Sequence, residues 1–246
     1  MENLLEVDSL ATDIGQFHIL TGVSFTVPEQ QITVLLGRNG AGKTTTLRTM
    51  MGYLPPRSGQ VRLRGESLQS VPTWQIVRKG VGYVPEDANI FANLSVAENL
   101  SLSLPGRHHR NSSNLALTQV QEQFPDLREH WQKPAGVLSG GQRQMLAIAC
   151  VLVGGPAVML IDEPSKGLSP LFVERLGDVL LTLQGSTTIL LVEQNFYLAS
   201  RVGQQYVLMD DGKTVAAGPM HELLAALDLQ QRYLGIRILS EEMNIP

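Results

Sequence analysis

The sequence has only one cysteine, Cys150, so no disulfide can form within the chain. A lone cysteine in an apolar, helix-like stretch is typical of a reducing compartment, where it packs as a small hydrophobic group. Basic residues are not in excess either, because 19 lysines and arginines face 23 acidic residues and the net charge is −4. A nucleic-acid-binding surface needs a basic stripe, so this composition argues against nucleic acid as a partner.

Long hydrophobic runs are also missing. No stretch approaches the roughly 18 apolar residues that a membrane-spanning helix requires, and Met1-Glu-Asn lacks the positive charge of a signal peptide. We therefore expect a protein without a transmembrane segment, peripheral to the cytoplasmic face of the cell membrane if it acts there. Repeats and low-complexity segments are absent, and a chain of 246 residues with 43% hydrophobic residues suits one α/β domain.

What the sequence does contain is a phosphate-binding pattern near its N-terminus. The pattern G-x-x-x-x-G-K-[ST] occurs without mismatch between an apolar run, 32–36, and a helix-like stretch, 45–51. Glycines let such a loop turn its N–H groups toward an anion, and the helix N-terminus adds partial positive charge. The lysine then reaches the β- and γ-phosphates, and the threonine hydroxyl ligates Mg²⁺. The predicted nucleotide contacts are Gly37, Arg38, Asn39, Gly40, Ala41, Gly42, Lys43, Thr44 and Thr45.

A second group of residues narrows what the nucleotide is used for. The segment Leu138-Ser-Gly-Gly-Gln142 opens a helix-like stretch, and the apolar run 157–161 that follows it ends in Asp162 and Glu163. Parallel strands are buried on both faces, and the chemistry lies at their C-terminal ends. Asp162 is therefore placed to hold Mg²⁺ through its water shell, and Glu163 to polarise a water for attack on the γ-phosphate.

Together these segments resemble the ATP-binding cassette (ABC) ATPases, from about Leu4 to Gly235. Within that family the chain looks like the ATPase subunits of branched-chain amino acid importers, the LivF-like group, which shades into urea and short-amide importers. The finer likeness rests on the segments 83–86, 138–142, 145–149, 163–165, 191–195 and 233–235.

The resemblance implies a P-loop NTPase core with a mostly parallel sheet, an N-terminal antiparallel β subdomain and an inserted α-helical subdomain. Residues 1–246 would then form a single ABC ATPase domain, with about 94–153 as its helical subdomain. The sequence predicts a capping box at Ser95 and Glu98, where that region begins.

Other local patterns predict individual elements. Alternating apolar residues favour strands at 4–7 and 23–27. The pair Ser169-Pro170 is typical of a capping serine followed by the first residue of a helix, here extending to Leu183. Asp211-Gly212 predicts the turn of a hairpin.

The resemblance also implies that two chains complete each nucleotide site. ATP would be held by the phosphate loop of one chain and, in trans, by Ser139, Gly140 and Gly141 of the other. Mg²⁺ would be held by Thr44 and Asp162.

The implied catalytic residues are Glu163, Gln194 and Glu86, and two of them depart from the broader family pattern. Glu86 stands where glutamine is common, which adds negative charge near the phosphates. Gln194 replaces a histidine, and glutamine donates an N–H but has no titratable proton, so we expect it to position the phosphate. Ile14 stands where an aromatic usually stacks on adenine, with Phe17 or His18 as possible substitutes, and Ser169 stands where many relatives have aspartate.

The implied partners are two polytopic membrane permease subunits, docked near 86–94, and a second cassette that is a paralogous ABC ATPase or another copy of this chain. A substrate-binding protein would take part indirectly. Two alternatives stay open: a soluble ABC ATPase that acts as a clamp without a transport role, and the ATPase of an exporter. Clamp proteins usually carry tandem cassettes, coiled-coil insertions or basic surfaces, and none of these is found in this sequence.

Overall fold

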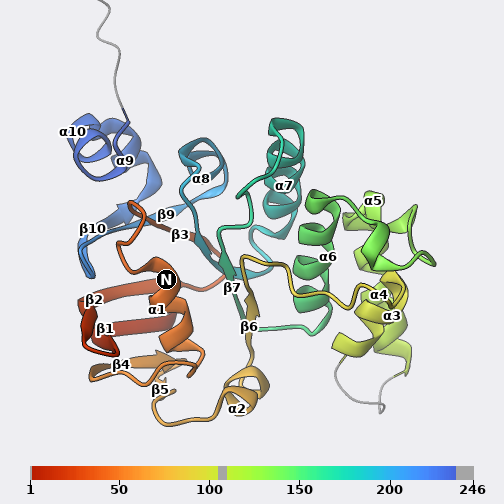
Figure 1. Ribbon diagram of the computed structural model, residues 1–246, viewed down its shortest axis with the longest axis horizontal. Helices are drawn as coiled ribbons and strands as arrows, with labels where there is room; N and C mark the ends of the chain where they lie inside the picture. Colours follow the sequence, from red (N-terminus) through yellow and green to blue (C-terminus); the bar gives the residue numbers. More distant parts are fainter. Residues whose placement is uncertain (1, 105–109, 237–246) are drawn as a thin grey trace, which may run out of the picture.

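The computed structural model describes residues 2–104 and 110–236 of the chain. One ten-stranded sheet runs through the molecule in the order β5-β4-β1-β2-β10-β9-β3-β8-β7-β6. Figure 1 shows the strands β1, β2, β4 and β5 at one end of the molecule and the helices α3 to α6 at the other. None of the helices within the described ranges is long and apolar enough to cross a membrane.

The N-terminal part of the sheet is antiparallel. It consists of β1 (Asn3–Ile14), β2 (Phe17–Pro28), β4 (Ser58–Leu63) and β5 (Glu66–Ser67). Strands β1 and β2 are longer than the predicted 4–7 and 23–27. The alternation of apolar residues is interrupted where the register shifts between Val7 and Leu10, so the pattern shows only part of each strand.

The remaining strands form the core of the fold. Strands β9 (Gln205–Asp210), β3 (Ile32–Leu36), β8 (Thr188–Val192), β7 (Val158–Asp162) and β6 (Val81–Val84) are parallel neighbours in that order. Strand β10 (Lys213–Pro219) returns antiparallel to β9, which confirms the predicted hairpin. Because the strands are parallel, the residues that follow β3, β6, β7 and β8 meet at one edge of the sheet.

Hydrophobic side chains pack on both faces of this sheet. Along β8, Ile189 and Leu191 join one buried cluster while Leu190 and Val192 join the other. The helices that complete these clusters are α1 (Lys43–Met50), α2 (Thr73–Arg78), α7 (Pro170–Leu183), α8 (Phe196–Val202) and α9 (Met220–Ala225), followed by the short α10 (Leu227–Leu229) and a π-helical turn, Gln230–Leu234. An unbroken apolar strand is the expected result of burial on two sides.

Between β6 and β7, the described residues form helices. These are α3 (Val96–Ser103), α4 (Arg110–Gln123), α5 (Pro125–Arg128), the 3₁₀ turn Ala135–Val137 and α6 (Gly140–Val153). The predicted capping box at the start of α3 is present. The assignment of about 94–153 as a separate subdomain stays a prediction, and its residues 105–109 lie outside the described ranges.

The prediction for α7 is confirmed in its bounds and wrong in one detail. Proline 170 is the first helical residue and Ser169 is the N-cap, but the Ser169 side chain makes no capping hydrogen bond. The fixed φ angle of proline favours the start of the helix at this position.

Candidate functional site

The predicted phosphate loop connects β3 to α1 at the edge where the parallel strands end. Gly42 is the N-cap of α1 with φ 97°, and a Cβ there would lie 2.6 Å from the Leu20 side chain. At Gly37 a Cβ would lie 2.3 Å from the carbonyl oxygen of Met209. Glycine is therefore required at both positions for the loop to turn closely past β9 and β2.

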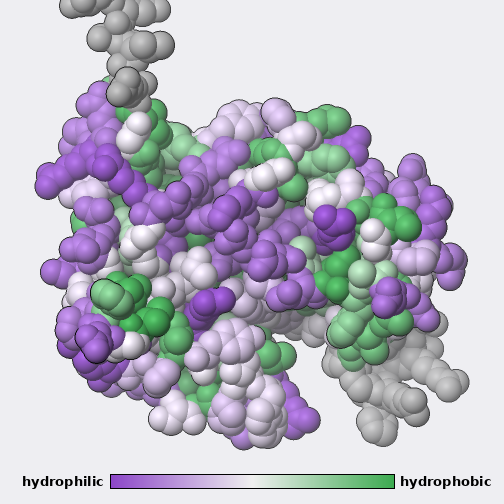
Figure 2. Space-filling model, in the orientation of Figure 1, coloured by the Kyte–Doolittle hydropathy of each residue, from purple (hydrophilic) through white to green (hydrophobic). Residues whose placement is uncertain are grey.

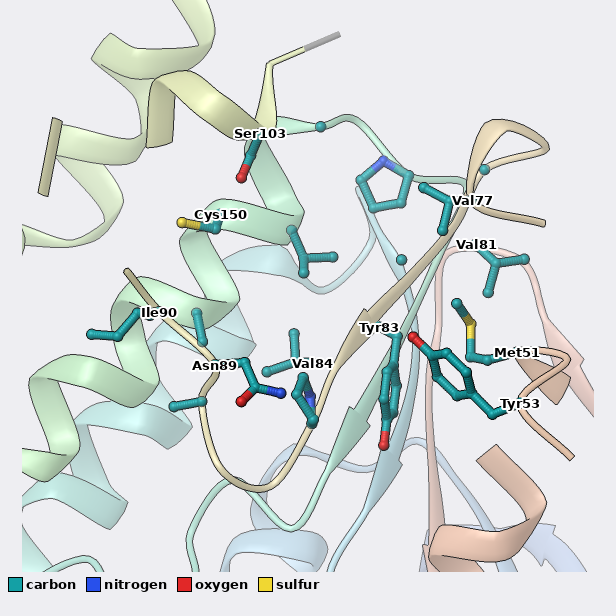
Figure 3. Close-up of a pocket in the computed structure, with 18 of the residues that line it drawn as sticks. Met51, Tyr53, Val77, Val81, Tyr83, Val84, Asn89, Ile90, Ser103 and Cys150 are labelled. Carbon is teal, nitrogen blue, oxygen red and sulfur yellow. The ribbon is translucent and has the colours of Figure 1, made fainter. Parts of the chain in front are cut away.

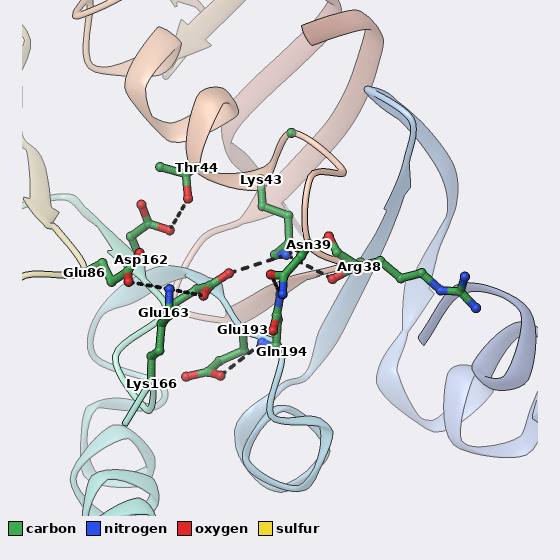
Figure 4. A network of polar contacts seen from close by, with 12 residues as sticks. Arg38, Asn39, Lys43, Thr44, Glu86, Asp162, Glu163, Lys166, Glu193 and Gln194 are labelled. Atoms are coloured by element: carbon green, nitrogen blue, oxygen red, sulfur yellow. Dashed lines mark hydrogen bonds and ion pairs between the residues drawn. The ribbon is translucent and has the colours of Figure 1, made fainter. Parts of the chain in front are cut away.

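Lys43 is buried in this loop and is held by it. Its Nζ donates to the carbonyl oxygens of Gly37, at 2.9 Å, and Arg38, at 3.1 Å. The same ammonium lies 3.5 Å from Oε1 of Glu163 (Figure 4). Burial lowers the pKa of Lys43, and the Glu163 carboxylate opposes that change. The Lys43 ammonium thus lies close to two carbonyl oxygens and one carboxylate oxygen.

Thr44 and Asp162 meet although they are far apart in the sequence. The Thr44 hydroxyl donates to Oδ1 of Asp162 at 3.1 Å, and the Tyr83 hydroxyl donates to Oδ2 at 3.3 Å. Burial raises the pKa of Asp162, while these two hydrogen bonds lower it. A hydroxyl and a carboxylate are the oxygen ligands that Mg²⁺ prefers, so this pair fits the metal expected from the sequence.

Two more carboxylates lie beside Asp162. Glu163 follows it directly, with a left-handed backbone (φ 43°), and its N–H donates to the carbonyl oxygen of Val192 at 2.9 Å. Glu86 follows β6, and its carboxylate accepts from Lys166 Nζ at 2.6 Å. The same Lys166 lies 4.0 Å from Oε2 of Glu163. Lys166 therefore provides a cation next to the extra negative charge of Glu86.

Gln194 joins the site from the end of β8. Its side-chain amide donates to Oδ1 of Asn39 in the phosphate loop (Figure 4). The residue before it, Glu193, is 1% exposed. Its carboxylate accepts hydrogen bonds from the N–H and hydroxyl of Ser165 and from the N–H groups of Gln194 and Asn195. Burial raises the pKa of Glu193, and its hydrogen bonds oppose that change.

The residues predicted to act in trans, Ser139, Gly140 and Gly141, lie at the start of α6. Ser139 Oγ accepts from the N–H of Gln142 at 3.3 Å, and Gln142 Oε1 accepts from the N–H of Ser139 at 2.9 Å. These hydrogen bonds are local to α6, and both Ser139 and Gly140 are exposed. A second chain would therefore have access to them, and their contact in trans stays a prediction.

The turn between β1 and β2 carries an exposed aromatic side chain. Ile14 pairs with Phe17 where β1 meets β2, and Phe17 is 74% exposed. His18 lies beside it, with Nδ1 2.7 Å from Oδ1 of Asp13. Phe17 and His18 were the two residues considered in place of an aromatic at Ile14. The ring of Phe17 is exposed and available for stacking, whereas His18 contacts the Asp13 carboxylate.

A cavity of about 1060 Å³ is lined by residues of β6, α3 and α6 and by the loops beside them. Figure 3 shows Tyr53, Tyr83 and Val77 on one side of it and Ile90 and Cys150 on the other. By contrast, the face of the molecule in Figure 2 is mainly hydrophilic, with apolar areas that are separated from one another. The cavity is thus a partly apolar, concave feature beside β6.

The loop along this cavity is fixed by a buried asparagine. Asn99 Oδ1 accepts from the N–H of Phe91 at 2.9 Å, and its Nδ2 donates to the carbonyl oxygens of Phe91 and Ser95 at 3.0 and 2.9 Å. Phe91 itself is 62% exposed. The structure thus holds an aromatic side chain out from a rigid loop, within the segment 86–94 expected to dock a partner.

The structure brings together most of the residues predicted for one chain, and it adds three that the sequence did not mark. Lys43, Thr44, Asp162, Glu163, Glu86, Gln194 and Asn39 are linked through the contacts above. The residues missed were Tyr83, Lys166 and Glu193. The capping role of Ser139 was also missed, although S-x-x-Q is a capping-box pattern that the sequence displays.

The chain is similar to known proteins over most of its length. A family model described as ABC transporter matches residues 20–166. The branched-chain amino acid transport ATP-binding protein BraG of Pseudomonas aeruginosa is 35% identical, over 94% of this chain and 100% of its own. The probable LivF protein of Archaeoglobus fulgidus is 36% identical, over 95% and 99%. The lipopolysaccharide export protein LptB of Haemophilus influenzae is 30% identical, over 95% and 98%.

A solved structure supports the fold. A nucleotide-free ATP-binding cassette from an ABC transporter superposes with a TM-score of 0.82 and 22% identity, covering 92% of this chain and 96% of that one.

Proposed function

Since the chain belongs to the ABC transporter family, we propose that it is the ATP-hydrolysing subunit of an importer for branched-chain amino acids or related amides or urea. The observation that carries the proposal is the meeting of Lys43, Thr44, Asp162, Glu163 and Gln194 at one sheet edge. Full-length likeness to the relatives named for branched-chain amino acid transport favours the importer over other transporters.

Within the site, each group has a distinct proposed role. The phosphate-loop N–H groups and Lys43 bind the phosphates, and Gln194 orients the γ-phosphate. Thr44 and Asp162 hold Mg²⁺, which supplies charge neutralisation at the phosphates when bound. Glu163 accepts a proton from the attacking water, and Glu86 orients that water.

Two chains are needed in this proposal, because Ser139, Gly140 and Gly141 of a second chain would cover the nucleotide. The exposed positions of Ser139 and Gly140 at the start of α6 support that role. The second chain is a paralogous cassette or another copy of this one. Hydrolysis would remove shared phosphate contacts and add charge repulsion, so the pair would open after each cycle.

The membrane partners are two polytopic permease subunits on whose cytoplasmic side the chain docks, with a substrate-binding protein acting indirectly. The cavity along β6 and the exposed Phe91 support docking of a partner helix there. A helix seated in an apolar groove is a common mode of recognition. We also propose that residues 1–246 act as one domain, with about 94–153 as its helical subdomain.

An exporter ATPase is the second candidate, favoured by the likeness to LptB over nearly the whole chain. Pull-down of the tagged chain from its native membranes in mild detergent, combined with an uptake assay, distinguishes the importer from the exporter. Co-purification of two polytopic proteins and a second cassette, with loss of leucine uptake when the chain is removed, is the result expected for the importer. Only soluble partners would exclude both transport roles, and unchanged uptake with impaired export would favour the exporter.

A further inference from the structure

Glu193 occupies an unusual place between the segments that follow β7 and β8. Its carboxylate is buried and accepts four hydrogen bonds. Ser165 donates twice, from N–H at 3.1 Å and from Oγ at 2.8 Å. The N–H groups of Gln194 and Asn195 donate at 3.2 and 3.1 Å. One side chain thus ties the segment after Glu163 to the segment that contains Gln194.

The hydrogen bonds to Glu193 make a rigid junction between the two segments. A buried carboxylate is stable only if donors replace the water it loses. In the described part of the chain no lysine or arginine forms an ion pair with Glu193, so N–H and O–H groups carry that function. All four donors are fixed by the backbone or by a buried serine, which leaves the two segments little freedom to move separately.

This junction lies directly between two groups of the proposed reaction. Gln194 is next to Glu193 and reaches Asn39 of the phosphate loop. Ser165 is two residues after Glu163, whose left-handed backbone is a conformation that non-glycine residues keep only when their surroundings enforce it. The bonds from Ser165 to Glu193 connect the segment that follows this strained backbone to the residue beside Gln194.

We infer that Glu193 is a positioning residue that couples Gln194 to Glu163, so that contact with the γ-phosphate sets the orientation of the base. The inference rests on the roles proposed for Gln194 and Glu163. Glu193 itself touches neither the phosphates nor the attacking water in this scheme. Its effect is therefore expected in the turnover rate and not in the affinity for nucleotide.

The test compares Glu193→Gln and Ser165→Ala with the intact chain. Glutamine keeps the size of the side chain but replaces one acceptor with a donor that faces N–H groups. We expect kcat of Glu193→Gln to fall about tenfold or more, as misplaced catalytic groups do, with KM for ATP within about threefold. Ser165→Ala removes only the hydroxyl bond and keeps the three backbone N–H bonds from residues 165, 194 and 195, so its kcat should fall less. Gln230→Met, which removes a buried amide bonded to Leu223 and Leu224, is the control for loss of a buried polar group elsewhere.

A second readout separates coupling from plain destabilisation. Hydrogen exchange of the peptide 163–168 is measured with and without Mg²⁺ and ATP. Slower exchange on ATP addition in the intact chain, lost in Glu193→Gln while the phosphate loop is still protected, supports the inference. Wild-type turnover in Glu193→Gln would overturn it, as would a lower kcat with retained protection of 163–168. Failure of the proposed function would look different, because the intact chain would then neither bind nor hydrolyse ATP. That result would overturn the proposed function together with the inference.

Discussion

At the level of single residues, each of the two lysines of the site is shared between several oxygens. The ammonium is shared between two loop carbonyls and the Glu163 carboxylate, and Lys166 is shared between Glu86 and Glu163. A bound triphosphate would compete with these oxygens for Lys43. Lys166 is 61% exposed, so its pair with Glu86 adds little to stability and matters mainly for the local charge.

Replacing Glu163 with glutamine should separate binding from turnover. The amide cannot accept a proton from water, so we expect ATP hydrolysis to fall by about 10²-fold or more. ATP binding should persist, and an ATP-bound pair of chains should accumulate in sedimentation experiments. Lys43→Ala is the matched control, because it should lose tight ATP binding itself. Hydrolysis at the wild-type rate by Glu163→Gln would remove Glu163 from the role of base.

Cys150 should be a slow nucleophile. Burial raises the pKa of its thiol from 9.0 to about 11, which leaves about a hundredfold less thiolate near pH 8 than an ordinary thiol has. We expect labelling by an aromatic disulfide reagent at pH 8 to be slower by about that factor than labelling of the chain unfolded in urea. Equal rates in the two states would show that the thiol is accessible and unperturbed.

Among the elements, α3 and α6 begin in the same way and serve different parts of the molecule. Each has a serine N-cap and a partner three residues later that returns a hydrogen bond, Glu98 in α3 and Gln142 in α6. Such caps satisfy N–H groups that the helix cannot satisfy itself. The cap of α6 also presents the Ser139 hydroxyl to the proposed second chain.

This repetition offers an internal control. Ser95→Ala and Ser139→Ala should each lower the free energy of unfolding by about 1 kcal/mol, since each removes one cap. Only Ser139→Ala should also weaken ATP-dependent pairing of chains and turnover, because only Ser139 is placed at the proposed nucleotide interface. Thermal unfolding and ATP hydrolysis measured on both variants test this. Equal losses of turnover would indicate that the cap acts through stability alone.

For the molecule as a whole, the sheet divides the apolar residues into two clusters and sets the functional groups at its edge. Strand β8, the middle one of the five parallel strands, contributes to both clusters with fully buried side chains. Strain or loss of packing there would be transmitted to Gln194 and Glu193, which follow the strand directly.

Truncation of this strand should therefore be costly. Leu190→Ala removes a side chain with no exposed surface and should lower the free energy of unfolding by about 2–5 kcal/mol. Leu171→Ala, at a residue that is 60% exposed on α7, should change it by about 0.5 kcal/mol or less. Urea unfolding followed by circular dichroism measures both. A similar small effect at both positions would contradict the central place of β8 in the core.

Much of the fold followed from local patterns. The strand, glycine loop and helix at 32–50, the capping box of α3 and the hairpin at Asp211-Gly212 were all predicted, because each depends on neighbouring residues. Strands β5 and β6 and the helices after β10 were not predicted. They have two to six residues, and their sequences show neither a clear alternation nor a helical period.

The sequence by itself determined which chemical groups the chain carries and, through the strand ends, the edge where Lys43 and Asp162 belong. Only the tertiary structure decided their partners. Contacts such as Thr44 with Asp162, 118 residues apart, depend on the order β3-β8-β7 in the sheet, which no local pattern encodes. Lys166 beside Glu86 and Glu193 beneath Ser165 are of the same kind. Their charges are plain in the sequence, but their pairing follows from packing distant segments into one sheet edge.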